Sequence, residues 1–119
     1  MIYGLGVDIE NISNIDKAYK NTGEMFLKKI LTKQEATCNK TIEDLTCYFS
    51  GKEAFFKAIG TGILNGYSFT DVEIKKGKGY TLNYNGGLKN FMKSNHLYAL
   101  LDITCFNDIV ISKVIVYKK

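Results

Sequence analysis

Residues 49–62 have the sequence FSGKEAFFKAIGTG and combine a helical apolar pattern with charges that this pattern does not explain. At about 100° per residue, the apolar side chains in and around this stretch fall on one arc of a helix: Leu45, Tyr48, Phe49, Phe55, Phe56 and Ile59. We expect the helix to run from about Ile42 to Ile59 and to end at Gly60, because glycine commonly follows the last turn of a helix.

Three charged side chains occupy unexpected positions on this helix. Lys52 projects into the middle of the apolar arc. It either lays its methylenes along the apolar surface to reach water, or has its charge paired near a site, since an unpaired buried ammonium is costly. Glu53 and Lys57 lie four residues apart at the margin of the arc. They either form an ordinary helix pair, worth a few tenths of a kcal/mol, or take part in a binding site.

The flanking segments predict an α+β domain, in which a mostly antiparallel sheet packs with a long central helix and short helices. Residues 2–10 alternate as a strand does, and two short helices broken near Thr22-Gly23 follow. Thr32 and Glu35 have the spacing of a capping box, which predicts another helix start. The second half predicts a hairpin around 77–79, a short helix at 86–95, and two long strands at 96–106 and 109–119. These last strands are the best candidates for the centre of the sheet.

Composition indicates a single domain spanning residues 1–119, with a net charge of +4 that comes from lysine alone, because the chain has no arginine. No run of apolar residues is long enough for a transmembrane helix, and no signal-peptide pattern is visible. The three cysteines are odd in number and widely spaced, which favours reduced thiols over a disulfide framework. We therefore expect a cytoplasmic protein that does not enter a membrane.

Asp8 is the first candidate functional residue. It shares one face of the predicted strand with Gly4 and Gly6, so another segment or a ligand could approach that face closely. Taken alone, Asp8 could equally be an exposed carboxylate. Together with Glu53, however, it could hold Mg²⁺, which usually binds one or two carboxylates plus waters and phosphate oxygens. Lys57 would then neutralise the same phosphates, as in a phosphoryl-transfer site. The following loop adds backbone N–H groups at Gly60, Thr61 and Gly62.

Three motifs resemble those of a known family: GVDIE at 6–10, FSGKEAFFKAIGTGI at 49–63 and SFTDVEI at 68–74. In order and spacing they resemble the holo-acyl-carrier-protein synthases, the short class of 4′-phosphopantetheinyl transferases. These enzymes transfer phosphopantetheine from coenzyme A to a serine of an acyl carrier protein and release 3′,5′-ADP, a step that serves fatty acid biosynthesis. The resemblance implies the fold of that family.

The resemblance also implies roles for individual residues. Asp8 and Glu53 would bind Mg²⁺ together with the coenzyme A diphosphate. Lys57 would contact phosphate and help the leaving group, and Lys52 would lie near the site. The carrier serine would attack the β-phosphorus and give its proton to Glu53 or to a metal-bound water. The remaining coenzyme-binding positions would be Gly60, Thr61, Gly62 and Cys105.

Two partners follow from the resemblance. An acidic acyl carrier protein would dock on the basic segment around Lys17 and Lys20, and further copies of the chain would form a homotrimer with the active site between neighbours. A nucleic-acid partner is not expected, because the basic segment lacks arginine and interleaved exposed aromatic side chains.

Several positions depart from the family pattern. The family usually has arginine at Tyr48 and histidine at Cys105, and both of those residues contribute to phosphate recognition. Asp102 could add unfavourable negative charge near the diphosphate, and lysines such as Lys113 could replace lost contacts. Cys105 itself could be a nucleophile or a small buried residue. These departures leave an alternative function: a non-catalytic relative that binds acyl carrier protein or coenzyme A.

Overall fold

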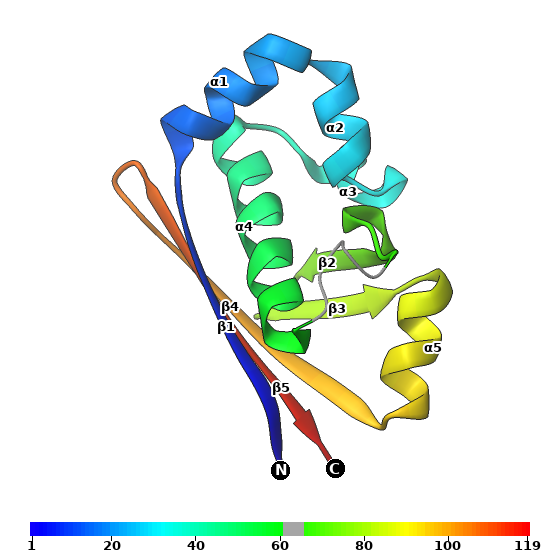
Figure 1. Cartoon of the computed structure of the whole chain (residues 1–119). Helices are drawn as coiled ribbons and strands as arrows, with labels where there is room; N and C mark the ends of the chain where they lie inside the picture. Colours follow the sequence, from blue (N-terminus) through cyan, green and yellow to red (C-terminus); the bar gives the residue numbers. More distant parts are fainter. Residues whose placement is uncertain (61–65) are drawn as a thin grey trace.

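The computed structural model describes residues 1–60 and 66–119. Helices and strands follow one another much as the sequence predicts (Figure 1). In chain order they are β1 (Ile2–Asn11), α1 (Ile12–Thr22), α2 (Glu24–Ile30), α3 (Lys33–Cys38), α4 (Ile42–Ile59), the 3₁₀ turn η2 (Phe69–Asp71), β2 (Val72–Lys76), β3 (Tyr80–Tyr84), α5 (Gly86–Ser94), β4 (Leu97–Phe106) and β5 (Ile109–Lys118). Within these described ranges, no helix is long and apolar enough to cross a bilayer.

Two antiparallel sheets enclose the long helix, which confirms the predicted α+β fold. The larger sheet has the strand order β1-β5-β4, and the smaller one is the β2-β3 hairpin. Helix α4 lies between them, with the short helices α1 and α2 beyond its N-terminal end (Figure 1). Of the two closing strands, only β5 is central, since β1 pairs with its free edge and leaves β4 at the edge of the sheet.

Glycines allow α4 to lie directly on the backbone of β1. A Cβ atom added to Gly4 would stand 1.8 Å from the carbonyl oxygen of Ala58, and one added to Gly6 would stand 1.9 Å from that of Ala54. Neither separation is possible for a real side chain, so both positions require glycine. The expectation that another segment approaches this face of the strand is confirmed, and that segment is α4.

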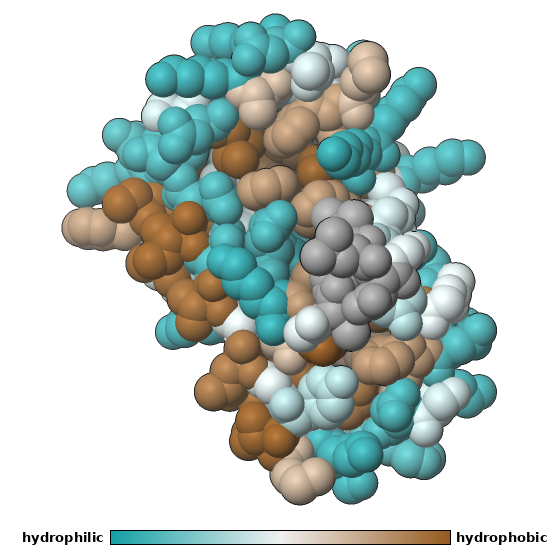
Figure 2. All heavy atoms as spheres, in the orientation of Figure 1, coloured by the Kyte–Doolittle hydropathy of each residue, from teal (hydrophilic) through white to brown (hydrophobic). Residues whose placement is uncertain are grey.

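The opposite face of the larger sheet is apolar and exposed. On β1 it carries Tyr3, Leu5, Val7 and Ile9, all at least 43% exposed. Leu5 lies beside Ile115 of β5, which in turn lies beside Leu100 of β4. Figure 2 shows apolar residues gathered along the side of the molecule where this sheet lies. We call this surface, made of the outward residues of β1, β5 and β4, the outer sheet face.

Lys52 is fully buried and does not reach water along the apolar arc of α4. Its Nζ lies 2.5 Å from Oε1 of Glu35 and donates a second hydrogen bond to the carbonyl of Ile30 at 2.7 Å. Glu35 also accepts hydrogen bonds from the backbone N–H groups of Thr32 and Ile74. The ammonium on the apolar side of the helix is therefore the centre of a satisfied polar network that joins α4 to α3 and β2.

Candidate active site

Asp8 and Lys57 are in direct contact, although they are 49 residues apart in the chain. Asp8 lies on the inner face of β1, two residues after Gly6 and on the side of the strand that packs against α4. Only 6% of its surface is exposed. Lys57 Nζ donates to Asp8 Oδ1 at 3.0 Å and to the carbonyl oxygen of Val7 at 3.2 Å. The described ion pairs thus join Lys57 to Asp8 rather than to Glu53, the partner that helix spacing alone would favour.

The second oxygen of Asp8 has no hydrogen-bond partner in the part of the chain that the structure describes. Oδ2 is buried, and no side-chain or backbone donor of the described residues reaches it. Glu53 lies close enough to be affected by this charge: burial first, and then the negative charge of Asp8, raise the pKa of Glu53, while Lys57 opposes the rise. Asp8 of β1 and Lys57 of α4 are thus in contact, and Glu53 of α4 lies near enough for its pKa to respond to both charges.

Glu10 is a third carboxylate of this cluster, which the sequence interpretation did not single out. Burial first, and then the neighbouring carboxylates of Asp8 and Glu53, raise the pKa of Glu10 to about 7, while Lys57 opposes the rise. Its position two residues after Asp8, on the same face of the strand, was the available signal. That signal is weak on its own, because carboxylates at alternate strand positions are usually solvated.

Two buried hydroxyl groups support the strand beneath the cluster. The Ser112 hydroxyl of β5 donates to the Ser50 oxygen of α4 at 2.8 Å, and Ser50 donates to the carbonyl oxygen of Asp8 at 3.4 Å. Both serines are fully buried. This chain of hydrogen bonds ties the backbone at Asp8 to α4 and to the central strand, so the carboxylate is held on a rigid base.

The residues present fit a magnesium ion. Among the described residues, no group of three or more His, Cys, Asp or Glu side chains has the arrangement of a complete metal cage. Mg²⁺ rarely uses such a cage and is usually held by one or two carboxylates, with waters and substrate phosphates completing the octahedron. The buried, unpartnered Oδ2 of Asp8, with Glu53 beside it, has the character of such a partial ligand set.

The other predicted site residues lie in different surroundings. Gly60 ends α4 in the left-handed conformation at φ 76°, while Thr61 and Gly62 lie outside the described residues. Lys52 is placed in the interior, where its ammonium is engaged by Glu35 and Ile30. Because these contacts leave it no route to a phosphate, we leave Lys52 out of the proposed site.

Cys105 and Tyr48, the two departures from the family pattern, line one cavity of about 320 Å³. Burial is the main cause that raises the pKa of the Tyr48 hydroxyl to about 12, so it remains a neutral hydrogen-bond donor. Lys76 and Tyr80 of the β2-β3 hairpin also line this cavity. Lysine and tyrosine side chains are thus available there for a polar ligand.

Asp102 and Lys113 do not lie on the inner side of the sheet. They face each other across β4 and β5 on the outer sheet face, in line with Val7 of β1, and their charged atoms are 3.6 Å apart. Within one chain, Asp102 therefore lies on the face of the sheet opposite to Asp8. Its negative charge does not face the inner side, where we propose that the diphosphate binds.

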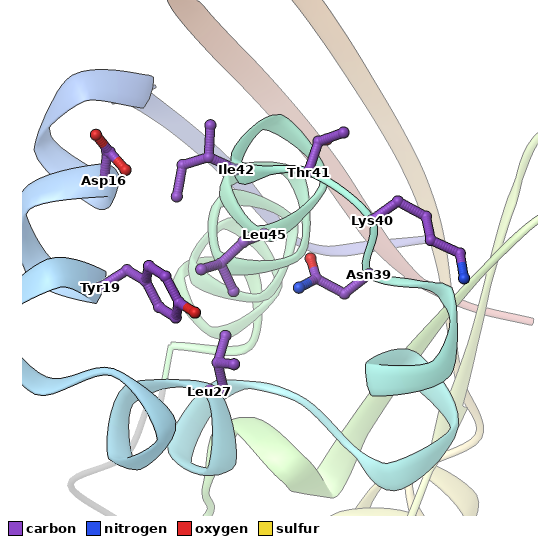
Figure 3. A pocket seen from close by; sticks show the side chains of 8 residues that line it. All are labelled: Asp16, Tyr19, Leu27, Asn39, Lys40, Thr41, Ile42 and Leu45. Carbon is purple, nitrogen blue, oxygen red and sulfur yellow. The ribbon is translucent and has the colours of Figure 1, made fainter.

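The basic segment predicted to receive a partner forms α1. Lys17 and Lys20 are both exposed, and Lys20 makes an ion pair of 2.9 Å with Asp16. A cavity of about 190 Å³ lies behind this helix, where Tyr19 of α1 and Leu27 of α2 face Leu45 of α4 (Figure 3). The carrier-docking role of the segment stays a prediction.

Comparison with known proteins identifies the family. Residues 4–112 match the family model described as the 4′-phosphopantetheinyl transferase superfamily. The chain belongs to this superfamily. It is 38% identical to the holo-[acyl-carrier-protein] synthase of Ligilactobacillus salivarius over 126 aligned positions, covering 99% of this chain and 89% of that relative. Matches to several other relatives of the same name are more local and span only 62% to 64% of those proteins.

Solved structures of the family have the same fold. The crystal structure of the Neisseria meningitidis holo-[acyl-carrier-protein] synthase superposes with a TM-score of 0.91 at 30% identity, covering 99% of this chain and 100% of the other. The Helicobacter pylori enzyme in complex with coenzyme A gives a TM-score of 0.84 at 26% identity, covering 95% and 99%. These comparisons confirm the resemblance to the phosphopantetheinyl transferases that the three sequence motifs indicated.

Proposed function

We propose that this chain transfers 4′-phosphopantetheine from coenzyme A to a serine of an apo-acyl carrier protein, in a Mg²⁺-dependent reaction that releases 3′,5′-ADP. The observation that carries the proposal is the buried, unpartnered Oδ2 of Asp8 next to Glu53 and Lys57. The names of the relatives and the coenzyme A complex of the Helicobacter pylori structure support the same substrates.

Asp8 and Glu53 are the residues that would hold Mg²⁺. Bound there, the ion would neutralise charge on the diphosphate of coenzyme A. The role of Asp8 is to present one fixed oxygen, because its other oxygen is held by Lys57 and its backbone is held through Ser50 and Ser112.

Lys57 would stabilise the leaving group. Its ammonium is anchored at Asp8 and Val7, yet the side chain is 52% exposed and keeps donor capacity toward a ligand. As the carrier serine oxygen forms its bond to the β-phosphorus, the bond from that phosphorus to the oxygen of 3′,5′-ADP breaks and negative charge accumulates there. A lysine placed beside the diphosphate offsets that charge.

Glu53 would accept the proton of the carrier serine. A carboxylate has two oxygens, so one oxygen of Glu53 can accept a proton while the other faces the ion. The serine hydroxyl thus loses its proton to a nearby carboxylate as its oxygen attacks phosphorus.

Partner surfaces complete the proposal. The exposed Lys17 and Lys20 on α1 supply positive charge for an acidic carrier protein. The outer sheet face supplies an apolar surface that a homotrimer would bury. The three free cysteines favour a reducing compartment, so we place the reaction in the cytoplasm.

Intact mass spectrometry of a purified apo-acyl carrier protein tests the proposal. The carrier is incubated with this protein, coenzyme A and Mg²⁺, and a parallel sample contains EDTA. A mass gain of one phosphopantetheine that disappears with EDTA is the expected result.

The second candidate, a non-catalytic binder of acyl carrier protein or coenzyme A, is favoured by Tyr48 and Cys105 in the cavity described above. It predicts carrier binding without any mass gain, with carriers of both fatty-acid and polyketide type. Multiple turnovers in the mass assay would exclude it.

A further inference from the structure

Two cysteines from distant parts of the chain meet at the edge of the core. Cys47, in the second turn of α4, and Cys105, near the end of β4, have sulfur atoms 3.4 Å apart although 58 residues separate them. Both are free thiols, and both line the cavity of about 320 Å³. The third cysteine, Cys38, lines the same cavity and is exposed, and its sulfur lies 3.8 Å from the hydroxyl of Thr37.

The geometry permits a bond between the first two sulfurs after a small movement. A disulfide requires sulfur atoms about 2.05 Å apart, so the pair must approach by roughly 1.4 Å. Cys105 pairs with Val110 one residue before β4 ends and the turn to β5 begins. A strand end next to a turn accommodates such a shift more readily than the middle of the sheet does.

Cys47 and Cys105 do not lie on the outer sheet face. Along β4 the buried residues Leu101 and Ile103 alternate with outward residues, which places Cys105 on the inner side with them. It is nevertheless exposed, because the covered part of the strand ends before it. In the single chain, an oxidant in solution can therefore reach Cys105 from the inner side of the sheet.

The two thiols differ in their environment. Cys105 is exposed, whereas Cys47 is half-buried, and burial is the main cause that raises the pKa of Cys47 above its ordinary value. Reaction with an oxidant requires a thiolate and access, which favours Cys105 as the first site of attack. Cys47, already in contact with that sulfur, is then placed to complete the bond.

We propose that Cys47 and Cys105 form a reversible intramolecular disulfide on exposure to a hydroperoxide. The Cys105 thiolate attacks the peroxide, its sulfur gains one oxygen as a sulfenic acid, and hydrogen peroxide is reduced to water. The Cys47 sulfur then displaces that oxygen, the S–S bond forms, and the Cys47 proton leaves with the hydroxyl as a second water. Two thiols are oxidised, one peroxide is reduced, and a dithiol reductant reverses the change.

The bond would join α4 to β4 at the wall of the cavity. Helix α4 also carries Glu53 and Lys57, so the modification fixes one end of the helix that presents the proposed site. The inference concerns the thiol pair alone and goes beyond the proposed function, because the bond forms whether or not the chain transfers phosphopantetheine.

Peptide mapping can locate the bond, since trypsin places the three cysteines in separate peptides: residues 34–40, 41–52 and 94–113. The full-length protein is reduced, freed of reductant and treated with one equivalent of hydrogen peroxide. The expected product is a monomer that has lost the mass of two hydrogen atoms and that yields a linked peptide of 41–52 with 94–113. Dithiothreitol should restore the original mass.

Three single variants complete the test. Cys38→Ser is the matched control and should form the bond as fully as the parent protein, whereas Cys47→Ser and Cys105→Ser should lose it. Circular dichroism checks that each variant is folded. Because Cys105 is exposed, Cys105→Ser should fold normally and still tests the bond if Cys47→Ser does not fold. A bond that includes Cys38, oxygen addition without a bond, or disulfide-linked oligomers on a non-reducing gel would each overturn the proposal.

Discussion

Lys57 on α4 contacts Asp8 on β1, with Nζ 3.0 Å from Oδ1, while Oδ2 of the same carboxylate is buried and has no partner among residues 1–60 and 66–119. One oxygen thus orients the helix lysine while the other stays available to a ligand. An isolated buried carboxylate oxygen is unfavourable unless a partner satisfies it. The arrangement therefore supports the proposed magnesium site, and we expect the loss of Asp8 and the loss of Lys57 to have different effects on the proposed reaction.

Substitutions at the three charged residues should separate metal binding from catalysis. Asp8→Asn and Glu53→Gln keep the side-chain shape and remove one negative charge each, so transfer should fall to the level of the EDTA control. Lys57→Ala should lower kcat by about 100-fold, because it removes a charge that stabilises the leaving group. Coenzyme A binding to Lys57→Ala, measured by calorimetry, should persist. Full activity of either carboxylate variant would refute the metal assignment.

The contact between α4 and β1 should not tolerate a side chain. Gly6→Ala would set a Cβ 1.9 Å from the carbonyl oxygen of Ala54, so either the strand or the helix must shift. Overpacking of this kind costs about 1–3 kcal/mol or more, and we expect at least that loss in the free energy of unfolding measured with urea. Gly79→Ala is the matched control, because a Cβ there meets nothing within 4 Å and the backbone is not left-handed. Equal stability of the two variants would contradict this explanation.

Most of the fold could be predicted because its signals are local. Thr32 and Thr41 each begin a helix with a capping box, Gly60 ends α4, and Asn107 makes the tight turn between β4 and β5. The sequence did not predict whether β1 pairs with β4 or with β5. Tertiary packing decides this pairing, and the sequence of the β4-β5 hairpin does not. The glycines of β1 indicated which face another segment could approach, but not that the segment is α4 or that the apolar face on the other side is left exposed in the single chain.

The residues themselves suggested Asp8, Glu53 and Lys57 as a site for magnesium and phosphate, and the resemblance proposed a role for each. Spacing brought Glu53 and Lys57 together on one helix, but the contact of Lys57 with Asp8 depends on the close packing that Gly4 and Gly6 permit. The environment of Lys52 was open to two interpretations, because its counter-ion Glu35 is 17 residues away and was recognised only as a capping residue. Pairings over such distances in sequence are decided by the tertiary fold.

The buried pair of Lys52 and Glu35 should be essential as a pair rather than as single charges. Lys52→Met leaves the carboxylate buried without its cation, and breaking a buried pair in this way costs about 3–5 kcal/mol. Adding Glu35→Gln removes the uncompensated charge and should recover part of the loss. The exposed pair of Lys20 and Asp16 is the comparison, since Lys20→Met should change the free energy of unfolding by about 0.5 kcal/mol or less. Urea unfolding is measured for the parent protein, Lys52→Met, the double variant and Lys20→Met. A double variant less stable than Lys52→Met would contradict this explanation.

Glu10 should make the metal-free protein less stable at neutral pH than at mildly acidic pH. Its pKa is about 7 in the folded chain against an ordinary value of 4.5, so between these values the folded state holds more protons than the unfolded state. The free energy of unfolding therefore falls as the pH rises from 4.5 to 7. Thermal melts in EDTA at pH 5 and pH 7.5 measure the effect, and Glu10→Gln should reduce the difference. An unchanged slope in this variant would assign the effect to other groups, such as Glu53, whose raised pKa acts in the same direction.

Charge reversal on α1 should weaken carrier recognition without altering the chemistry. Lys17 and Lys20 are exposed and do not contact Asp8, Glu53 or Lys57 in any described hydrogen bond or ion pair, so Lys17→Glu with Lys20→Glu should leave kcat within about twofold. The KM for the acyl carrier protein should rise about tenfold or more, and this effect should shrink at high salt, since screening reduces surface attraction. Lys89→Glu on α5 is the control, because it reverses the charge of another exposed lysine outside α1. A loss of kcat at constant KM would mean that the helix supports the site and not the carrier.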